Sequence, residues 1–174
     1  MAQQPLRKTG AYQKPRSKTV KKRKKTLSVG EIIERNKKRS QKPHPQYGTS
    51  KLEDRFAIDF LDKLGVKYER QFFAPDIKRY YDFYLPEERI LIEVDGDWYH
   101  GYGLVYEDMN PMQKHNARVD KIKNEWALSR GIPIIRIWEH DINEHPRKVL
   151  TRLMAEIGFA EIKKAINDGK KKRH

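Results

Sequence analysis

Acidic residues and a histidine gather at the end of an apolar segment in the middle of the chain. The segment spans residues 90–101 and has the sequence ILIEVDGDWYHG. Its first half is typical of a buried strand, and Gly96 allows the chain to turn at its end. The polar groups at this turn are Glu93, Asp95, Asp97 and His100. A buried strand that ends in carboxylates and a histidine is a common basis for a metal site on an α/β sheet.

The chemistry of these residues favours a hard divalent cation. Side chains alternate along a strand, so Glu93 and Asp95 share one face and Val94 takes the other. Asp82, in an earlier strand-like segment, is expected beside Asp95, and two such carboxylates repel each other without a cation. Oxygen ligands suit Mg²⁺, with Mn²⁺ as a substitute, and the absence of cysteine excludes a thiolate zinc site. Alternatively, Glu93 and Asp95 cover an exposed sheet edge.

The positive charge of the chain is concentrated at its N-terminus. The formal net charge is +14, and residues 1–50 contain 15 Lys/Arg and 2 Asp/Glu. The composition of residues 1–27 predicts disorder in isolation. Such an arm indicates a polyanionic partner, most often nucleic acid, or alternatively a membrane surface or a solubilising role. Its densest run, predicted to contact phosphates or to act as a nuclear address, is Lys21, Lys22, Arg23, Lys24 and Lys25.

The rest of the chain predicts a mixed sheet that positions the acidic residues. Apolar periodicity predicts helices over residues 28–40, 51–64, 112–130 and 146–166. Strands are predicted over residues 68–73, 77–84, 89–95 and 132–138. The long helix between the last two strands implies that they are parallel. We therefore expect an α/β (α+β) fold, a four-stranded mixed sheet flanked by helices on both faces.

Three regions follow from these patterns. Residues 1–48 form a basic arm with a short helix, residues 49–158 the main domain, and residues 159–174 a C-terminal helix with a basic tail. Ser28 and Glu31 have the spacing of a capping box at the start of the short helix. Its Ile32 and Ile33 give it little apolar surface to bury. No apolar run approaches the roughly 20 residues that span a bilayer, and no signal peptide is evident, so we expect a cytoplasmic protein, nucleoid-associated or in a phage host.

Four short motifs, in this order, carry a family resemblance over about residues 49–142. They are Glu53 in the first domain helix, Asp82 in YYDFYLP, the strand and turn IEVDGDWYHG, and NARVD in the second long helix. This pattern resembles the PD-(D/E)XK nuclease superfamily. More closely it resembles the very-short-patch-repair (Vsr) endonucleases and the phage homing endonucleases named for an E-D-x-H-D pattern.

The resemblance implies a role for each motif residue. Asp82 would bind the metal ion, and Val94 and Asp95 fall at further ligand positions, one of them a backbone carbonyl. His100 falls at the catalytic histidine, where it would exchange a proton with water or the leaving group. Asp120 falls at the carboxylate that fixes the tautomer of this histidine, and Glu53 at a helix glutamate that reaches into the site.

Two departures from the family pattern affect the interpretation. Vsr repair enzymes carry a structural zinc on cysteines, which this chain lacks, so mismatch repair is not the favoured role. The mainstream superfamily has lysine at the position of Asp95. Glu93 is then either a metal ligand, as in the mainstream pattern, or a residue whose side chain points to the other face of the sheet.

Several of these residues also have structural interpretations. Glu53 lies three residues after Ser50 and could simply complete a capping box. Asp120 could lie on a solvated helix face. Trp98 and Tyr99 either stack on bases or pack in the core. Lys121 and Lys123, close to Asp120, are predicted to contact a phosphate.

The sequence therefore predicts a Mg²⁺-dependent endodeoxyribonuclease. DNA is its expected partner, with no membrane contact and no small-molecule cofactor besides the metal. Its role would be homing, recombination or degradation of foreign DNA. One alternative is a non-catalytic nucleic-acid-binding protein that retains a nuclease fold. Another is an RNA-binding assembly protein, which would prefer structured RNA to duplex DNA.

Overall fold

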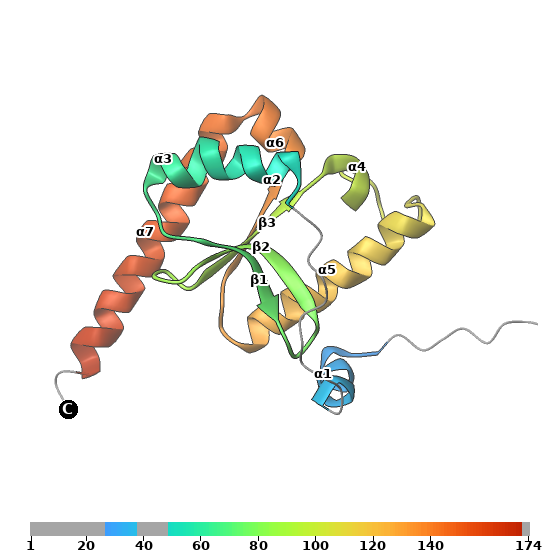
Figure 1. The fold of residues 1–174 in the computed structure, drawn as a ribbon, viewed down its shortest axis with the longest axis horizontal. Helices are drawn as coiled ribbons and strands as arrows, with labels where there is room; N and C mark the ends of the chain where they lie inside the picture. The colour runs from blue at the N-terminus through green and yellow to red at the C-terminus, as the bar shows by residue number, and fades with distance from the viewer. Residues whose placement is uncertain (1–26, 38–48, 172–174) are drawn as a thin grey trace, which may run out of the picture.

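A four-stranded mixed sheet forms the centre of the molecule (Figure 1). The computed structural model describes residues 27–37 and 49–171, with side chains to residue 162. The strands lie in the order β1 (Glu69–Ala74), β2 (Arg79–Leu85), β3 (Ile90–Asp95) and β4 (Ile134–Trp138). β2 is antiparallel to both β1 and β3, whereas β4 runs parallel to β3. The predicted fold class is confirmed.

Helices cover both faces of this sheet (Figure 1). One face carries a long helix over residues 51–64, together with α6 (Glu139–Glu144) and α7 (Pro146–Lys171). The other face carries α1 (Val29–Lys37) and α5 (Pro111–Ser129). A single turn, α4 (Asp97–His100), follows β3. Neither α4 nor α6 was predicted from the sequence, because both are too short for apolar periodicity to show.

The helix over residues 51–64 is continuous but changes its winding. It consists of α2 (Lys51–Phe56), a π-helical stretch η1 (Ala57–Leu61) and α3 (Asp62–Leu64). Its apolar residues, spaced as a helical face, are buried against the sheet. Gly65 ends it with a φ of +67°, a left-handed conformation that glycine adopts without strain.

β3 is the central strand, and all six of its residues are buried. Ile92 and Val94 pack into the core beneath the helix of residues 51–64 and α7. Leu91 packs into the opposite core, with residues of α1 and α5. By alternation, Glu93 and Asp95 lie on the α5 side of the sheet, as predicted. The two carboxylates are therefore buried between β3 and α5.

The short helix α1 packs on the domain more closely than its sequence suggested. The predicted capping box at its N-terminus is present, with Ser28 N–H donating to Glu31 Oε2 over 2.7 Å. Val29 and Ile32 are buried in the core that contains Trp126, so the expectation that this helix has little to bury is wrong. The predicted end of the helix falls outside the described residues.

No helix in the described residues has the length and apolar character needed to cross a bilayer.

Candidate functional site

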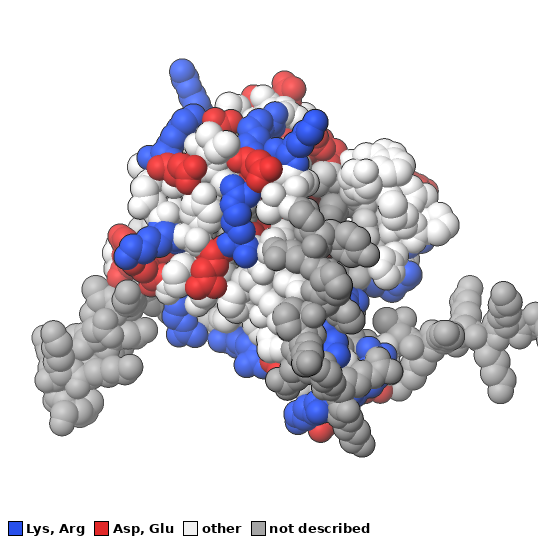
Figure 2. Space-filling model, in the orientation of Figure 1, with Lys and Arg blue, Asp and Glu red and all other residues white. Residues whose placement is uncertain are grey.

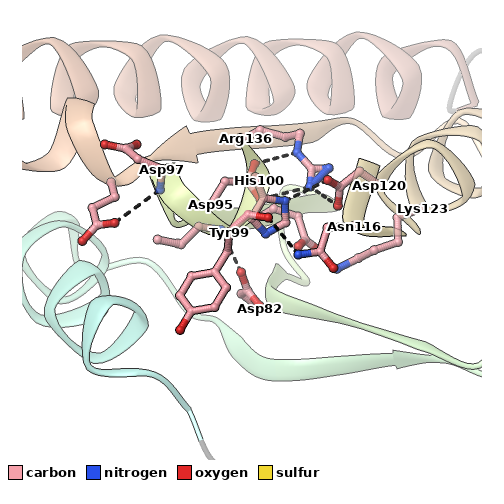
Figure 3. Close-up of polar contacts among 12 residues, drawn as sticks. Asp82, Asp95, Asp97, Tyr99, His100, Asn116, Asp120, Lys123 and Arg136 are labelled. Carbon is pink, nitrogen blue, oxygen red and sulfur yellow. Dashed lines mark hydrogen bonds and ion pairs between the residues drawn. The ribbon is translucent and has the colours of Figure 1, made fainter. Parts of the chain in front are cut away.

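The end of β3 is the foundation of the candidate site. Glu93 and Asp95 are 4% and 1% exposed, so neither covers a solvated sheet edge. β4 follows β3 in parallel register, with Glu93 opposite Arg136. The α5 helix crosses the same side of the sheet and carries Asp120 and Lys123. Charged side chains from two strands and a helix therefore meet in a largely buried space (Figure 3).

Asp82 enters this space from β2. The backbone pairing of β2 with β3 ends at Phe83 and Ile92. Next to this pair, the Asp82 carboxylate accepts a hydrogen bond from β3 in place of a backbone carbonyl. Its Oδ2 accepts the Val94 N–H over 2.7 Å. Burial raises the pKa of Asp82 from 3.8 to about 6, although the charge of Lys123 acts in the opposite direction. Such a dehydrated carboxylate is a group that a bound cation would stabilise.

Glu53 takes part in two arrangements at once. Ser50 N–H donates to its Oε1 over 3.2 Å, and its own N–H donates to Ser50 Oγ, which completes the capping box. Its Oε2 accepts a hydrogen bond of 2.7 Å from the Gln71 side-chain amide. Gln71 has a φ of +53°, a strained conformation for a residue with a side chain. Glu53 thus caps its helix and also lies beside Asp82 in the lining of the same cavity.

His100 and Asp120 are in direct contact. His100 Nδ1 lies 2.8 Å from Asp120 Oδ2 and 3.6 Å from Asp95 Oδ1. Burial by itself would lower the pKa of His100, but the hydrogen bond to Asp120 and the charge of Asp95 outweigh it and raise the pKa. The predicted pairing of His100 with Asp120 is present in the structure.

Two amides of α5 hold the turn that carries His100. Gln113 Nε2 donates to the Trp98 carbonyl over 2.6 Å. Asn116 Nδ2 donates to the Tyr99 carbonyl over 2.9 Å. The orientation of the imidazole therefore depends on the contact between α4 and α5 as well as on Asp120.

Two basic residues supply positive charge among these carboxylates. Arg136 donates from Nε to Asp95 Oδ2 over 2.7 Å and from Nη2 to Asp95 Oδ1 over 3.0 Å. The same Nη2 donates to Asp120 Oδ1 over 2.7 Å. Lys123 is buried and forms an ion pair with Glu93. Arg136 and Lys123 therefore relieve part of the repulsion between acidic residues that the sequence indicated.

These side chains line one cavity of about 250 Å³. It brings together the predicted residues Glu53, Asp82, Glu93, Asp95, His100, Asp120 and Lys123, with Val94, Asn116 and Val119. Asp95, His100 and Asp120 have the arrangement of a metal site, since each offers a ligand atom and these atoms lie within 4.8 Å of one another. Carboxylate oxygens suit a hard ion such as Mg²⁺. Asp97 turns away instead and accepts the His140 N–H over 3.0 Å.

Most of the residues predicted to contact nucleic acid lie outside this cavity. Trp98 and Tyr99 are 63% and 58% exposed, so core packing does not explain them. Figure 2 shows a bulge without charged side chains over this region of the molecule. Lys121 is exposed, with a 3.8 Å contact to Glu125, whereas Lys123 is one of the buried residues of the cavity. The run from Lys21 to Lys25 falls outside the described residues.

Sequence reasoning missed Arg136, Gln71 and Gln113. Arg136 did leave a signal, because it is the one charged residue in the apolar strand IIRIW. Charge inside such a strand usually has a buried partner. Gln71 left no comparable signal, since its importance comes from an unusual backbone conformation.

The partly buried Asp82 carboxylate predicts a specific pH dependence of stability. Its pKa is higher in the folded protein than its ordinary value of 3.8, so the folded state binds more protons between about pH 4 and 6. Asp82 therefore reduces the free energy of unfolding as pH rises through this range. Asp82→Asn removes this cost, so the stability of the variant relative to the unmodified protein should rise by about 2–3 kcal/mol between pH 4 and 7. Urea unfolding in EDTA at both pH values measures it, and a constant difference would refute the assignment.

Comparison with known proteins points to one relative. No protein-family model matches the chain. The chain is 29% identical to the type II nicking enzyme V.HpaIIP of Haemophilus parainfluenzae, in an alignment that covers 51% of this chain and 68% of that enzyme. This distant similarity agrees with the resemblance to nucleases and does not separate the repair branch from the homing branch.

Proposed function

We propose that this chain is a metal-dependent endonuclease that hydrolyses phosphodiester bonds in DNA. The observation that carries the proposal is the cavity in which Asp82, Asp95, His100 and Asp120 meet, from two strands (β2 and β3) and two helices (α4 and α5). The similarity to a nicking enzyme supports the same conclusion. Nicked duplex DNA is therefore the first product to be sought.

The acidic cavity would hold the divalent ion. Asp82 is the first candidate ligand, because its carboxylate is partly buried, its pKa is raised by burial, and it forms no ion pair within the described part of the chain. Glu93 and Asp95 line the same space. When bound, Mg²⁺ would polarise the phosphate and lower the pKa of a water molecule.

His100 is suited to proton transfer. Its Nδ1 is engaged by Asp120, so its Nε2 is the nitrogen available to the reacting groups. Asp120 is in turn fixed by Arg136. We infer that His100 exchanges a proton at Nε2 with the attacking water or the leaving oxygen, while Asp120 holds its tautomer.

The exposed aromatic residues beside the site would contact the DNA bases. Trp98→Ala and Tyr99→Ala should each weaken binding to duplex DNA by about 10-fold, because a stacked base contributes about 1–3 kcal/mol. Both side chains are largely exposed, so stability should change by less than about 0.5 kcal/mol. Fluorescence anisotropy measures the affinity. Phe159→Ala on α7, which removes another exposed aromatic ring, is the control, and equal affinities for all the variants would exclude this contact.

The basic arm would add an electrostatic grip on the backbone. Its Lys21–Lys25 run is proposed to contact phosphates, and Lys121 extends the basic surface beside the site. Contacts of this kind depend strongly on salt concentration, unlike base stacking.

One set of assays separates this function from its alternatives. Binding and cleavage are measured on duplex DNA, single-stranded DNA and structured RNA at matched salt, with Mg²⁺ and with EDTA. The proposal expects cleavage of DNA in Mg²⁺ alone. Tight DNA binding without cleavage under any condition would indicate a non-catalytic nucleic-acid-binding protein, and a preference for structured RNA would indicate an RNA-binding role.

A further inference from the structure

Arg136 occupies the space between two carboxylates that otherwise resemble a metal site. Its guanidinium contacts both oxygens of Asp95 and one oxygen of Asp120, at 2.7–3.0 Å. Its side chain is only 20% exposed, and those of Asp95 and Asp120 are 2% and 19% exposed. A planar guanidinium is suited to paired contacts with carboxylates, and it remains charged at any relevant pH. The cluster of Asp95, His100 and Asp120 thus already contains a fixed cation.

The remaining carboxylates of the cavity differ in their partners. Glu93 is paired with Lys123, and Glu53 accepts hydrogen bonds from Ser50 and Gln71. Asp82 uses Oδ2 to accept the Val94 N–H, and its Oδ1 accepts no hydrogen bond within the described part of the chain. Glu93, Asp95 and Asp120 are paired with cations, and both oxygens of Glu53 accept hydrogen bonds. Among the described acidic groups that line the cavity, Asp82 is therefore the one that combines an unpaired charge with a carboxylate oxygen that accepts no hydrogen bond.

We propose that Arg136 takes the place of a second divalent ion at Asp95 and Asp120, so that the site binds a single ion, which depends on Asp82. An ion placed in the Asp95, His100 and Asp120 cluster would lie against the guanidinium and be repelled by it. Asp95 and Asp120 are then positioning residues that hold Arg136 and His100. The inference rests on the proposed metal dependence and concerns how many ions the site takes and where.

The test counts Mn²⁺ ions bound to the full chain without DNA, by the electron paramagnetic resonance signal of free Mn²⁺. The unmodified protein should bind one ion. Asp82→Asn should lower its affinity at least 10-fold, whereas Asp95→Asn should change it less than 3-fold. Two ions on the unmodified protein, or one ion that is lost in Asp95→Asn and kept in Asp82→Asn, would overturn the proposal. These measurements do not require Arg136 to be replaced.

Replacing Arg136 tests its role directly. Arg136→Met removes the charge at similar length, and this variant should bind a second Mn²⁺ ion, which Asp95→Asn in the same chain should remove again. Arg152→Met is the matched control: Arg152 donates to the Arg136 carbonyl from α7, and its loss should leave one ion bound. Circular dichroism establishes that each variant is folded. A folded Arg136→Met variant that still binds one ion would contradict the inference.

Failure of the inference can be told apart from failure of the proposed function. Nicking of plasmid DNA in Mg²⁺ by a protein that binds two Mn²⁺ ions would overturn the single-ion site and leave the nuclease function standing. A protein that binds no Mn²⁺ and does not nick DNA would overturn both.

Discussion

Asp82→Asn should lower the rate of DNA strand cleavage by about 10³-fold or more, because a metal ion supplies several kcal/mol of transition-state stabilisation. Asparagine keeps the shape of the side chain, and its amide oxygen can still accept the Val94 N–H. The variant should therefore fold and bind DNA as the unmodified protein does. Initial rates on supercoiled plasmid in Mg²⁺ measure the loss.

A second aspartate provides the matched control for this experiment. Asp59 lies in the helix of residues 51–64, where it pairs with Lys63 at the surface. Asp59→Asn makes the same chemical change outside the cavity and should leave the cleavage rate within about 2-fold, as expected for a surface substitution. Equal activity of Asp82→Asn and Asp59→Asn would remove Asp82 from the site.

His100→Ala should reduce cleavage by about 10²–10⁴-fold, the usual contribution of a general acid or base. Binding of Mn²⁺ should survive this change, because the proposed ion depends on Asp82. Single-turnover rates at saturating protein separate the chemical step from DNA binding. Full activity of a folded His100→Ala variant would exclude proton transfer by this residue.

Substitution of Asp120 shows whether His100 and Asp120 act together in catalysis. Asp120→Asn should reduce cleavage less than His100→Ala, and the double variant should be no slower than His100→Ala alone, because residues that act as a unit are not additive. His115→Ala replaces an exposed histidine of α5 and should have no effect. Additive losses in the double variant would show that Asp120 acts independently of His100.

The sheet and the meeting of its acidic residues could be predicted because they follow from short-range patterns. Alternation along β3 placed Glu93 and Asp95 on one side and Val94 on the other, and the hairpin from β2 brought Asp82 near them. The helix between β3 and β4 implied the parallel pairing that is observed. The capping box at Ser50 and Glu53 was likewise visible in the spacing of two residues.

The partners of these carboxylates could not be predicted, since they depend on how the elements pack. Lys123 lies on a helix rich in charged residues and was predicted to contact a phosphate, yet the packing of α5 on β3 buries it against Glu93. Arg136 reaches Asp95 and Asp120 only because β4 places it opposite Glu93. Repulsion between acidic residues was recognised from the sequence, but the cations that relieve it come from segments whose register the sequence does not specify.

The most direct test is the incubation of purified protein with supercoiled plasmid in the presence of Mg²⁺. We predict that the plasmid becomes open-circular, that EDTA prevents the conversion, and that the Asp82→Asn protein does not produce it. Plasmid and oligonucleotide substrates that stay intact with the unmodified protein, in Mg²⁺ or Mn²⁺ and in duplex, single-stranded or branched form, would contradict the assignment of this molecule as a metal-dependent nuclease.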